Sequence, residues 1–186
     1  MKKFNSLNTL KTSYSPTIYK NKKTLKKYKK KNLFTCLNNY NKKDNILDYF
    51  LTTKCIDFYK IKKDLIYNIY SNSQLNPNKI ISPNQILSNC WFNTFFMCFF
   101  ISDKGKKFFK YFRELMTKGF IKQKNKKKYI GKKLHIYFIL FNLLIESTYG
   151  NYKESIIFAQ NFDTNSIISG IYNNLPNRFT TDKTYY

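Results

Sequence analysis

The longest apolar stretch of the sequence lies within NQILSNCWFNTFFMCFFI, residues 84–101. From Cys90 to Ile101 nearly every position is apolar, which predicts a helix that is buried on most sides. Ser88 or Asn89 would cap this helix, because Ser and Asn side chains accept hydrogen bonds from the free N–H groups of a first turn. A membrane-spanning helix needs about 20 apolar residues, so we expect a core helix that begins at Cys90 and no membrane span.

Helical periodicity and helix-ending residues recur on both sides of this stretch. Gly119, Gly150 and Pro176 each follow a segment of helical spacing and mark its end. The residue before Pro83 avoids the helical region, so residues 79–83 are expected to be extended. The segments predicted to be helical are 46–51, 56–70, 104–118, 134–149 and 163–174, with N-caps at Asp44, Asp103 and Asp163 or Thr164, and a basic loop is expected at 122–133. The predicted fold class is therefore α+β, predominantly helical, with little strand in the second half of the chain.

The composition divides the chain into three parts. Residues 1–32 are polar and basic, with little that could bury a core, so we expect a disordered arm. Residues 33–176 would form a single, mostly helical domain that contains the stretch at 84–101. One domain is what a chain of 186 residues commonly holds. Residues 177–186 are interpreted as a tail or a truncation point.

The chain is strongly basic, with 34 basic residues, 10 acidic residues and a formal net charge of +24. Such a charge favours binding to polyanions, which include nucleic acid, acidic proteins and anionic membrane surfaces. In the arm, Tyr19 and Tyr28 are interleaved with lysines, which is compatible with non-specific nucleic-acid contact. The alternative is that A/T-rich codons supplied lysine wherever a surface was free, so that the lysines form a solvated surface or tail.

The cysteine and histidine content argues against a metal centre, and no cofactor is expected. The cysteines are Cys36, Cys55, Cys90 and Cys98; no pair has CxxC spacing, and the single histidine, His135, cannot complete a zinc set. No apolar signal segment follows the N-terminal Met-Lys-Lys, so we expect free thiols in a reducing, intracellular compartment. Cys98 lies two turns after Cys90 on the same predicted helix and is expected in the core.

The position of Cys90 indicates thiol chemistry. A nucleophilic cysteine must be a thiolate, and the start of a helix lowers a thiol pKa through the helix dipole and free N–H groups. An amide side chain just upstream, Gln85 or Asn84, could stabilise the oxyanion of a tetrahedral intermediate together with the Cys90 N–H. Trp91 would pack the helix end and form a wall of the site.

The segment around Cys90 resembles the cysteine box of the ubiquitin-specific proteases. That box has an amide residue five positions before the Cys, and then an aromatic residue, any residue, Asn and Ser after it. The papain-like enzymes are similar, with a Gln six positions before a Cys-Trp pair, which is the position of Asn84. With ISDKG at 101–105 and an aromatic-rich helix following, the sequence is similar to cysteine peptidase-like proteins of large DNA viruses. The residues that match the first box are Gln85, Cys90, Trp91, Phe92, Asn93 and Thr94.

This resemblance implies the nucleophile-helix half of a papain-like thiol hydrolase. It implies hydrolysis of a peptide or isopeptide bond in a polypeptide such as ubiquitin or a viral precursor, in a host cytoplasm or a virion. Cys90 would attack the carbonyl, Gln85 would stabilise the oxyanion, and Trp91 and Asn84 would contact the substrate.

Two features depart from the family pattern. The family carries glycine between the amide and the Cys, where this chain has Ile-Leu-Ser-Asn. The family's general-base histidine lies far downstream on a strand, whereas His135 lies inside an apolar helical segment.

Several interpretations of Cys90 therefore stay open. The chain is an active peptidase with His135 as base, or an incomplete or inactive form whose His-bearing region lies outside these residues, or a protein in which Cys90 is a buried structural cysteine. The alternative for the whole chain is a non-catalytic basic protein that binds nucleic acid or belongs to a virion.

Overall fold

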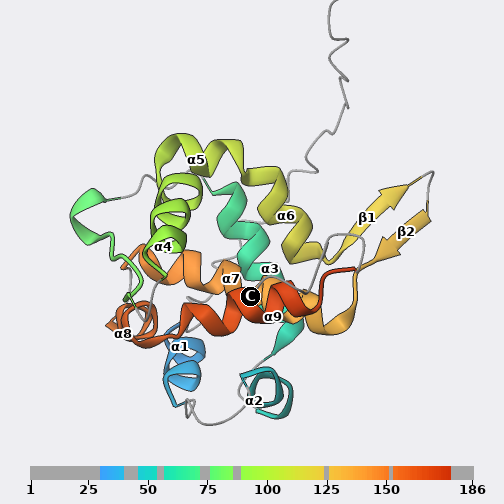
Figure 1. The fold of residues 1–186 in the computed structure, drawn as a ribbon, viewed down its shortest axis with the longest axis horizontal. Coiled ribbons are helices and arrows are strands. Elements are labelled where there is room, and N and C mark those ends of the chain that lie inside the picture. Colours follow the sequence, from blue (N-terminus) through green and yellow to red (C-terminus); the bar gives the residue numbers. More distant parts are fainter. Residues whose placement is uncertain are drawn as a thin grey trace, which may run out of the picture.

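Figure 1 shows the fold of the computed structural model, in which helices pack together and one small hairpin extends from them. The structure describes residues 30–39, 46–53, 57–71, 76–85, 89–123, 126–150 and 153–176. The predicted arm lies outside these residues except at positions 30–32, and the predicted tail at 177–186 and the predicted N-cap Asp44 lie outside them as well.

A central helix, α7 (Lys132–Thr148), organises the described part of the chain. Helices α2, α3, α6, α8 and α9 pack around it, and it crosses the middle of Figure 1. Apolar residues occupy nearly all sides of α7, so Ile139, Leu140, Leu144 and Ile145 have no exposed surface. Burial stabilises the fold by about 1.5–3 kcal/mol for each such side chain. The helix predicted at 134–149 is confirmed.

Shorter helices enclose α7. α1 packs against α8, and α3 packs against α6, so pairs of helices close the sides of the core. No helix in the described ranges is both long and apolar enough to cross a membrane. The other elements are α1 (Lys30–Asn38), α2 (Ile46–Thr52), α3 (Phe58–Tyr70), η1 (Pro77–Lys79), α4 (Cys90–Phe96), the π-helix η2 (Met97–Ile101), α5 (Asp103–Phe108), α6 (Lys110–Lys118), β1 (Phe120–Gln123), β2 (Lys126–Tyr129), α8 (Lys153–Asn161) and α9 (Thr164–Asn173).

The strongly periodic segments form the helices that their patterns predict. α2, α3 and α9 correspond to the segments predicted at 46–51, 56–70 and 163–174. The predicted cap of α9 is confirmed, because the Asp163 carboxylate accepts a hydrogen bond from the Asn165 N–H at 2.9 Å. Helices α1 and α8 add to the predicted set; they are short and depend on packing against each other and, for α8, against α7.

The helix predicted at 104–118 is two helices, α5 and α6. The predicted cap Asp103 is wrong, because the Ser102 hydroxyl accepts the hydrogen bond from the Gly105 N–H at 3.1 Å. Gly105 has no room for a side chain, since a Cβ there would collide with backbone carbonyl groups of η2. α5 therefore packs directly on the backbone of η2. Gly119 ends α6 with a φ of 72°, as predicted.

β1 and β2 form an antiparallel hairpin that extends away from the helices in Figure 1. The basic loop predicted at 122–133 is therefore wrong for most of its length. Lysines fill many positions on both faces of the strands, so the sequence lacks the apolar alternation that predicts a strand. Phe120 and Tyr129 lie directly opposite each other with ring centroids 5.5 Å apart, which joins the strands beside α6 and α7. A mostly helical structure with this small sheet is broadly α+β, as predicted.

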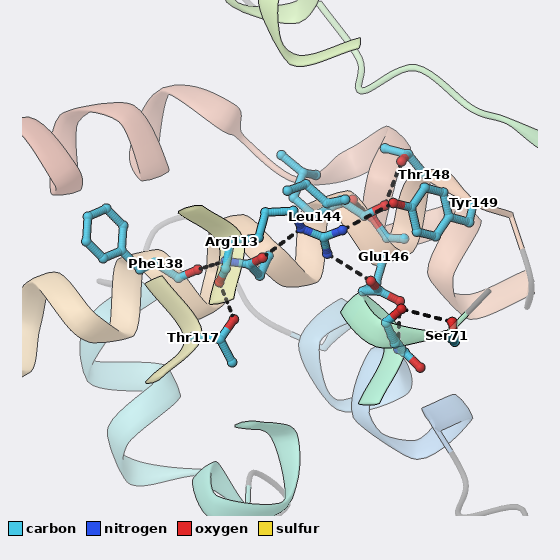
Figure 2. A network of polar contacts seen from close by, with 12 residues as sticks. Ser71, Arg113, Thr117, Phe138, Leu144, Glu146, Thr148 and Tyr149 are labelled. Carbon is cyan, nitrogen blue, oxygen red and sulfur yellow. Dashed lines mark hydrogen bonds and ion pairs between the residues drawn. The ribbon is translucent and has the colours of Figure 1, made fainter. Parts of the chain in front are cut away.

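Arg113 of α6 is buried against α7, with 1% of its surface exposed. Figure 2 shows its guanidinium directed at polar groups of that helix. Nε donates to Asn142 Oδ1 at 3.0 Å, Nη2 donates to Glu146 Oε1 at 2.9 Å, and Nη1 lies 3.4 Å from Tyr149 Oη. Asn68 of α3 donates to the second Glu146 oxygen at 2.7 Å. The buried charge is thus matched, and three helices are joined through one carboxylate.

Breaking this network should destabilise the fold. Arg113→Met leaves the Glu146 carboxylate buried without its cation, and we expect the free energy of unfolding to fall by about 3–5 kcal/mol. Arg113→Met combined with Glu146→Leu removes both charges and should recover most of that loss, because apolar side chains can replace a buried ion pair at little cost. Urea denaturation monitored by circular dichroism measures both. Equal destabilisation in the two variants would contradict the assignment.

Candidate functional site

Cys90 is the first residue of α4, as predicted, and its side chain is exposed. Asn89 precedes it and is buried, but its side chain makes no capping hydrogen bond. The Asn89 amide instead donates to the Thr164 hydroxyl at 2.5 Å, which ties the start of α4 to the start of α9. The other predicted cap, Ser88, lies outside the described residues. The interpretation of Cys90 as a buried structural cysteine is wrong.

A second buried amide lies one turn into α4. Asn93 follows Cys90 by three positions and so lies on the same side of the helix. Its side chain is 8% exposed, and its Nδ2 donates to the Pro83 carbonyl at 3.2 Å. The Asn93 Oδ1 is buried and accepts no hydrogen bond from the described residues. The chain before Cys90 is therefore held back against the first turn of the helix that Cys90 begins.

The predicted oxyanion and substrate residues lie in the same connection. Asn84 and Gln85 are exposed and belong to no helix or strand, while residues 86–88 lie outside the described set. No hydrogen bond joins either amide to Cys90 among the described residues. Trp91 is 58% exposed, and its ring centroid lies 6.0 Å from that of Phe92. The structure thus brings these side chains to one region without assembling an oxyanion hole there.

The prediction that α4 is buried on most sides is wrong. Its inner side packs on α7, where the rings of Phe96 and Phe141 lie 5.7 Å apart. The outer side exposes Trp91, Phe95 and also Cys98, which was expected in the core. The physical reason is that α7 packs against the inner side of α4, while the described part of the chain leaves Trp91 and Phe95 on the outer side exposed.

His135 lies in the first turn of α7 and is packed rather than open. Its Nε2 is 3.0 Å from the Thr117 carbonyl oxygen, and its ring lies edge-on to Phe58 at 5.2 Å. Gly119 lies so close that a Cβ there would collide with the imidazole. Burial lowers the pKa of His135, and the nearby Lys62 ammonium lowers it further, while the hydrogen bond to Thr117 acts in the opposite direction. At neutral pH the ring is therefore an uncharged packing group.

The structure does not bring His135 and Cys90 together. The segment before Cys90 is attached at the other end of α7, where the Ile81 N–H donates to the Thr148 carbonyl at 2.9 Å. An α-helix rises 1.5 Å per residue, so His135 and Thr148 lie about 20 Å apart along α7. In Figure 1, α4 and the hairpin that precedes His135 lie on opposite sides of the molecule.

Of the three described cysteines, one differs from its predicted state as a free thiol. Cys90 and Cys98 are free, but Cys36 is disulfide-bonded to a partner outside the described residues. The expectation of free thiols throughout is therefore wrong at Cys36. No CxxC spacing in the sequence indicates this bond. In the described ranges no group of three or more His, Cys, Asp or Glu side chains could hold a metal ion.

Sequence reasoning missed the buried network of Arg113 and Glu146. A signal was present, since arginine occurs only twice among the 34 basic residues, at Arg113 and Arg178. Arginine holds a buried carboxylate better than lysine does, because its planar guanidinium donates in a fixed fork. A rare arginine within an aromatic helix therefore indicates a buried ion pair.

Comparison of this chain with protein-family models, with curated proteins and with solved structures finds no match. The function is therefore inferred from the geometry described above and from the segment around Cys90.

His135 should make the stability of the fold depend on pH. Because its folded pKa is lowered, the unfolded state binds a proton more readily, and stability is lost as pH falls below the unfolded value of about 6.5. His135→Gln keeps an N–H donor for the Thr117 carbonyl and cannot titrate in this range. Urea denaturation at several pH values between about 8 and 5 should therefore show a smaller loss of stability in the variant. Identical losses would show that His135 does not titrate as described.

Proposed function

We propose that this chain is a cysteine peptidase-like protein in which the Cys90 thiolate attacks the carbonyl of a peptide or isopeptide bond. One observation carries the proposal: the Cys90 side chain is exposed at the first residue of a helix, in a backbone that buried Asn89 and Asn93 hold in position. A nucleophile needs both an accessible sulfur and a fixed approach to its substrate.

The start of α4 supports thiolate chemistry. The first N–H groups of a helix have no partner within it, and α4 continues directly into η2, so a longer set of aligned peptide dipoles favours an anion at Cys90. In this proposal the Cys90 N–H and Gln85 or Asn84 stabilise the oxyanion, and exposed Trp91 contacts the polypeptide.

The nature of the substrate rests on the resemblance around Cys90, which favours ubiquitin or a viral precursor. The same resemblance favours a host cytoplasm or a virion as the location. Of these two locations, the disulfide at Cys36 favours the virion, because disulfides persist at virion surfaces and are rare in a cytoplasm.

The general base in this proposal is a group other than His135. The His135 ring is engaged by Thr117 and Phe58, and it lies near the opposite end of α7 from the segment that leads into Cys90. A base must reach the thiol at hydrogen-bond distance or through one water molecule. We therefore infer that the base comes from residues beyond the described ranges or from a second polypeptide.

Thiol labelling tests the proposal, and Cys98 supplies a matched control because it is exposed on the same continuous helix. We expect iodoacetamide to label Cys90 faster than Cys98, because Cys90 lies beside the free N–H groups of a helix start and Cys98 does not. At neutral pH, labelling of the Cys98→Ser variant should be roughly tenfold faster than that of Cys90→Ser. His135→Gln should leave the rate at Cys90 unchanged.

Equal labelling rates of the two thiols would overturn the nucleophile assignment. A large loss of Cys90 reactivity in His135→Gln, with the fold intact by circular dichroism, would restore His135 as the base.

A second candidate function, polyanion binding, is favoured by the β1–β2 hairpin. Lys126, Lys127 and Lys128 are consecutive and exposed, so they point to alternating faces of the strand. Lys127 lies directly opposite Lys122, so positive charge is concentrated along the hairpin. A two-stranded ribbon of this size fits a nucleic-acid groove, where lysines neutralise phosphates.

Salt-dependent binding to duplex DNA tests this candidate. Changing Lys126, Lys127 and Lys128 together to Gln should weaken binding and make the slope of log affinity against log salt less steep by about 2–3 units. Fluorescence anisotropy of a labelled duplex at several salt concentrations measures the slope.

The matched control removes the same charge elsewhere. Lys63, Lys79 and Lys153 are also exposed, and their joint change to Gln should alter the slope less. Equal effects of the two triple variants would mean that only the net charge of the chain attracts DNA.

A further inference from the structure

The outer side of α4 belongs to a larger exposed aromatic surface that continues over η2, α5 and the start of α6. These rings are exposed although each is large and apolar, and nothing in the described part of the chain covers them. We call this surface the aromatic face; its residues, with the exposed fraction of each, are Trp91 (58%), Phe95 (55%), Phe99 (38%), Phe108 (81%) and Phe112 (47%).

Trp91 precedes Phe95 by four positions and so lies on the same side of α4, and the other rings of the aromatic face are joined by ring contacts. Phe95 and Phe99 have centroids 4.9 Å apart, and Phe99 lies 5.2 Å from Phe109. Phe109 in turn contacts Phe108 at 5.0 Å and Phe112 at 6.5 Å. Half-buried Phe109 thus joins rings from separate helices into one patch, and contiguous apolar patches of this kind mark interaction sites.

The charge beside the aromatic face is positive. Residues 90–112 contain four lysines and one acidic residue, Asp103. Lys104 and Lys107 are exposed on α5, and Lys104 precedes Phe108 by four positions, so the two side chains share one side of the helix. The nearest further carboxylate along the chain, Glu114, is buried and paired with Lys118.

We propose that the aromatic face docks on an anionic lipid bilayer. Aromatic side chains that lie next to lysines on one surface insert shallowly at the boundary between headgroups and acyl chains, while the lysine ammonium groups reach the lipid phosphates. Charge complementarity identifies the partner, because the chain carries +24 and the lysines beside these rings outnumber the carboxylate.

The shape of the surface also fits a bilayer. α5 forms an outer corner of the molecule in Figure 1, and Phe108 at its end is the most exposed ring of the set. The aromatic face includes no part of the pocket lined by Leu37, Phe158 and Phe162, which lies between α1 and α8. A projecting corner inserts into a bilayer without needing a groove. This inference does not depend on the chemistry of Cys90.

Trp91 is the only tryptophan of the chain, so its fluorescence reports on this surface alone. Vesicles of phosphatidylcholine mixed equally with phosphatidylserine should shift the Trp91 emission to shorter wavelength, and brominated lipids should quench it. Sedimentation with these vesicles should be at least roughly tenfold stronger than with phosphatidylcholine alone, because anionic lipids attract each surface lysine.

Matched variants separate insertion from charge attraction. Phe108→Glu should weaken vesicle binding roughly tenfold or more, since it removes an inserted ring and adds a repelled charge. Tyr59→Glu makes the same charge change at a similarly exposed ring on α3, where exposure is 79%, and should weaken binding much less. Phe95→Glu provides a second test on α4, and circular dichroism confirms that each variant folds.

Three results would overturn the proposal. They are the absence of binding to anionic vesicles, binding without a change in Trp91 emission, and equal weakening by Phe108→Glu and Tyr59→Glu. The last two would mean that the basic chain adsorbs through charge alone, and the first would assign the aromatic face to a protein partner.

Discussion

The structure depends on one constraint, which is that α7 must be shielded from water on almost every side. An amphipathic helix needs neighbours on one side only, but α7 carries apolar residues nearly all around and therefore needs a complete enclosure. Shorter helices supply that enclosure, and Arg113 enters it because Asn142 and Glu146 present acceptors within the apolar surface. This arrangement also explains why His135 is a packing group, since the same enclosure buries its ring.

The sequence predicts the fold where a single helix carries its own signal. α7, α9 and the start of α4 at Cys90 are recognisable from periodicity and capping residues, which are local properties. A local sequence pattern does not show which other parts of the chain will pack against a helix. The exposure of Phe95 and Cys98 and the Cys36 disulfide could therefore not be predicted. The prediction of a loop at the hairpin was wrong for a different reason. Lysines lie on both faces of β2, so the sequence lacks the alternation of apolar and polar residues that indicates a strand.

The candidate site was predictable to the same degree. The pattern around Cys90 is local, and the start of α4 at this residue agrees with what the spacing indicates, whereas the exposure of the thiol did not follow from the sequence. The role of His135 as base for Cys90 required two distant segments of the chain to lie in contact. The spacing of residues along the sequence does not show whether such segments meet in space. Exposed aromatic rings adjoin the thiol, so a surface suited to binding and a nucleophile share one continuous helix.

The π-helix η2 has a consequence for how this region can vary. A π-turn holds one residue more than an α-turn, and here it sets the angle at which the Ser102 cap and Gly105 meet the preceding backbone. Deleting one residue between Met97 and Ile101 would remove the extra residue of this turn and so change the way in which Ser102 and Gly105 meet the preceding backbone. Natural variation in this segment should therefore consist of substitutions at constant length, with insertions and deletions confined to the loops on either side.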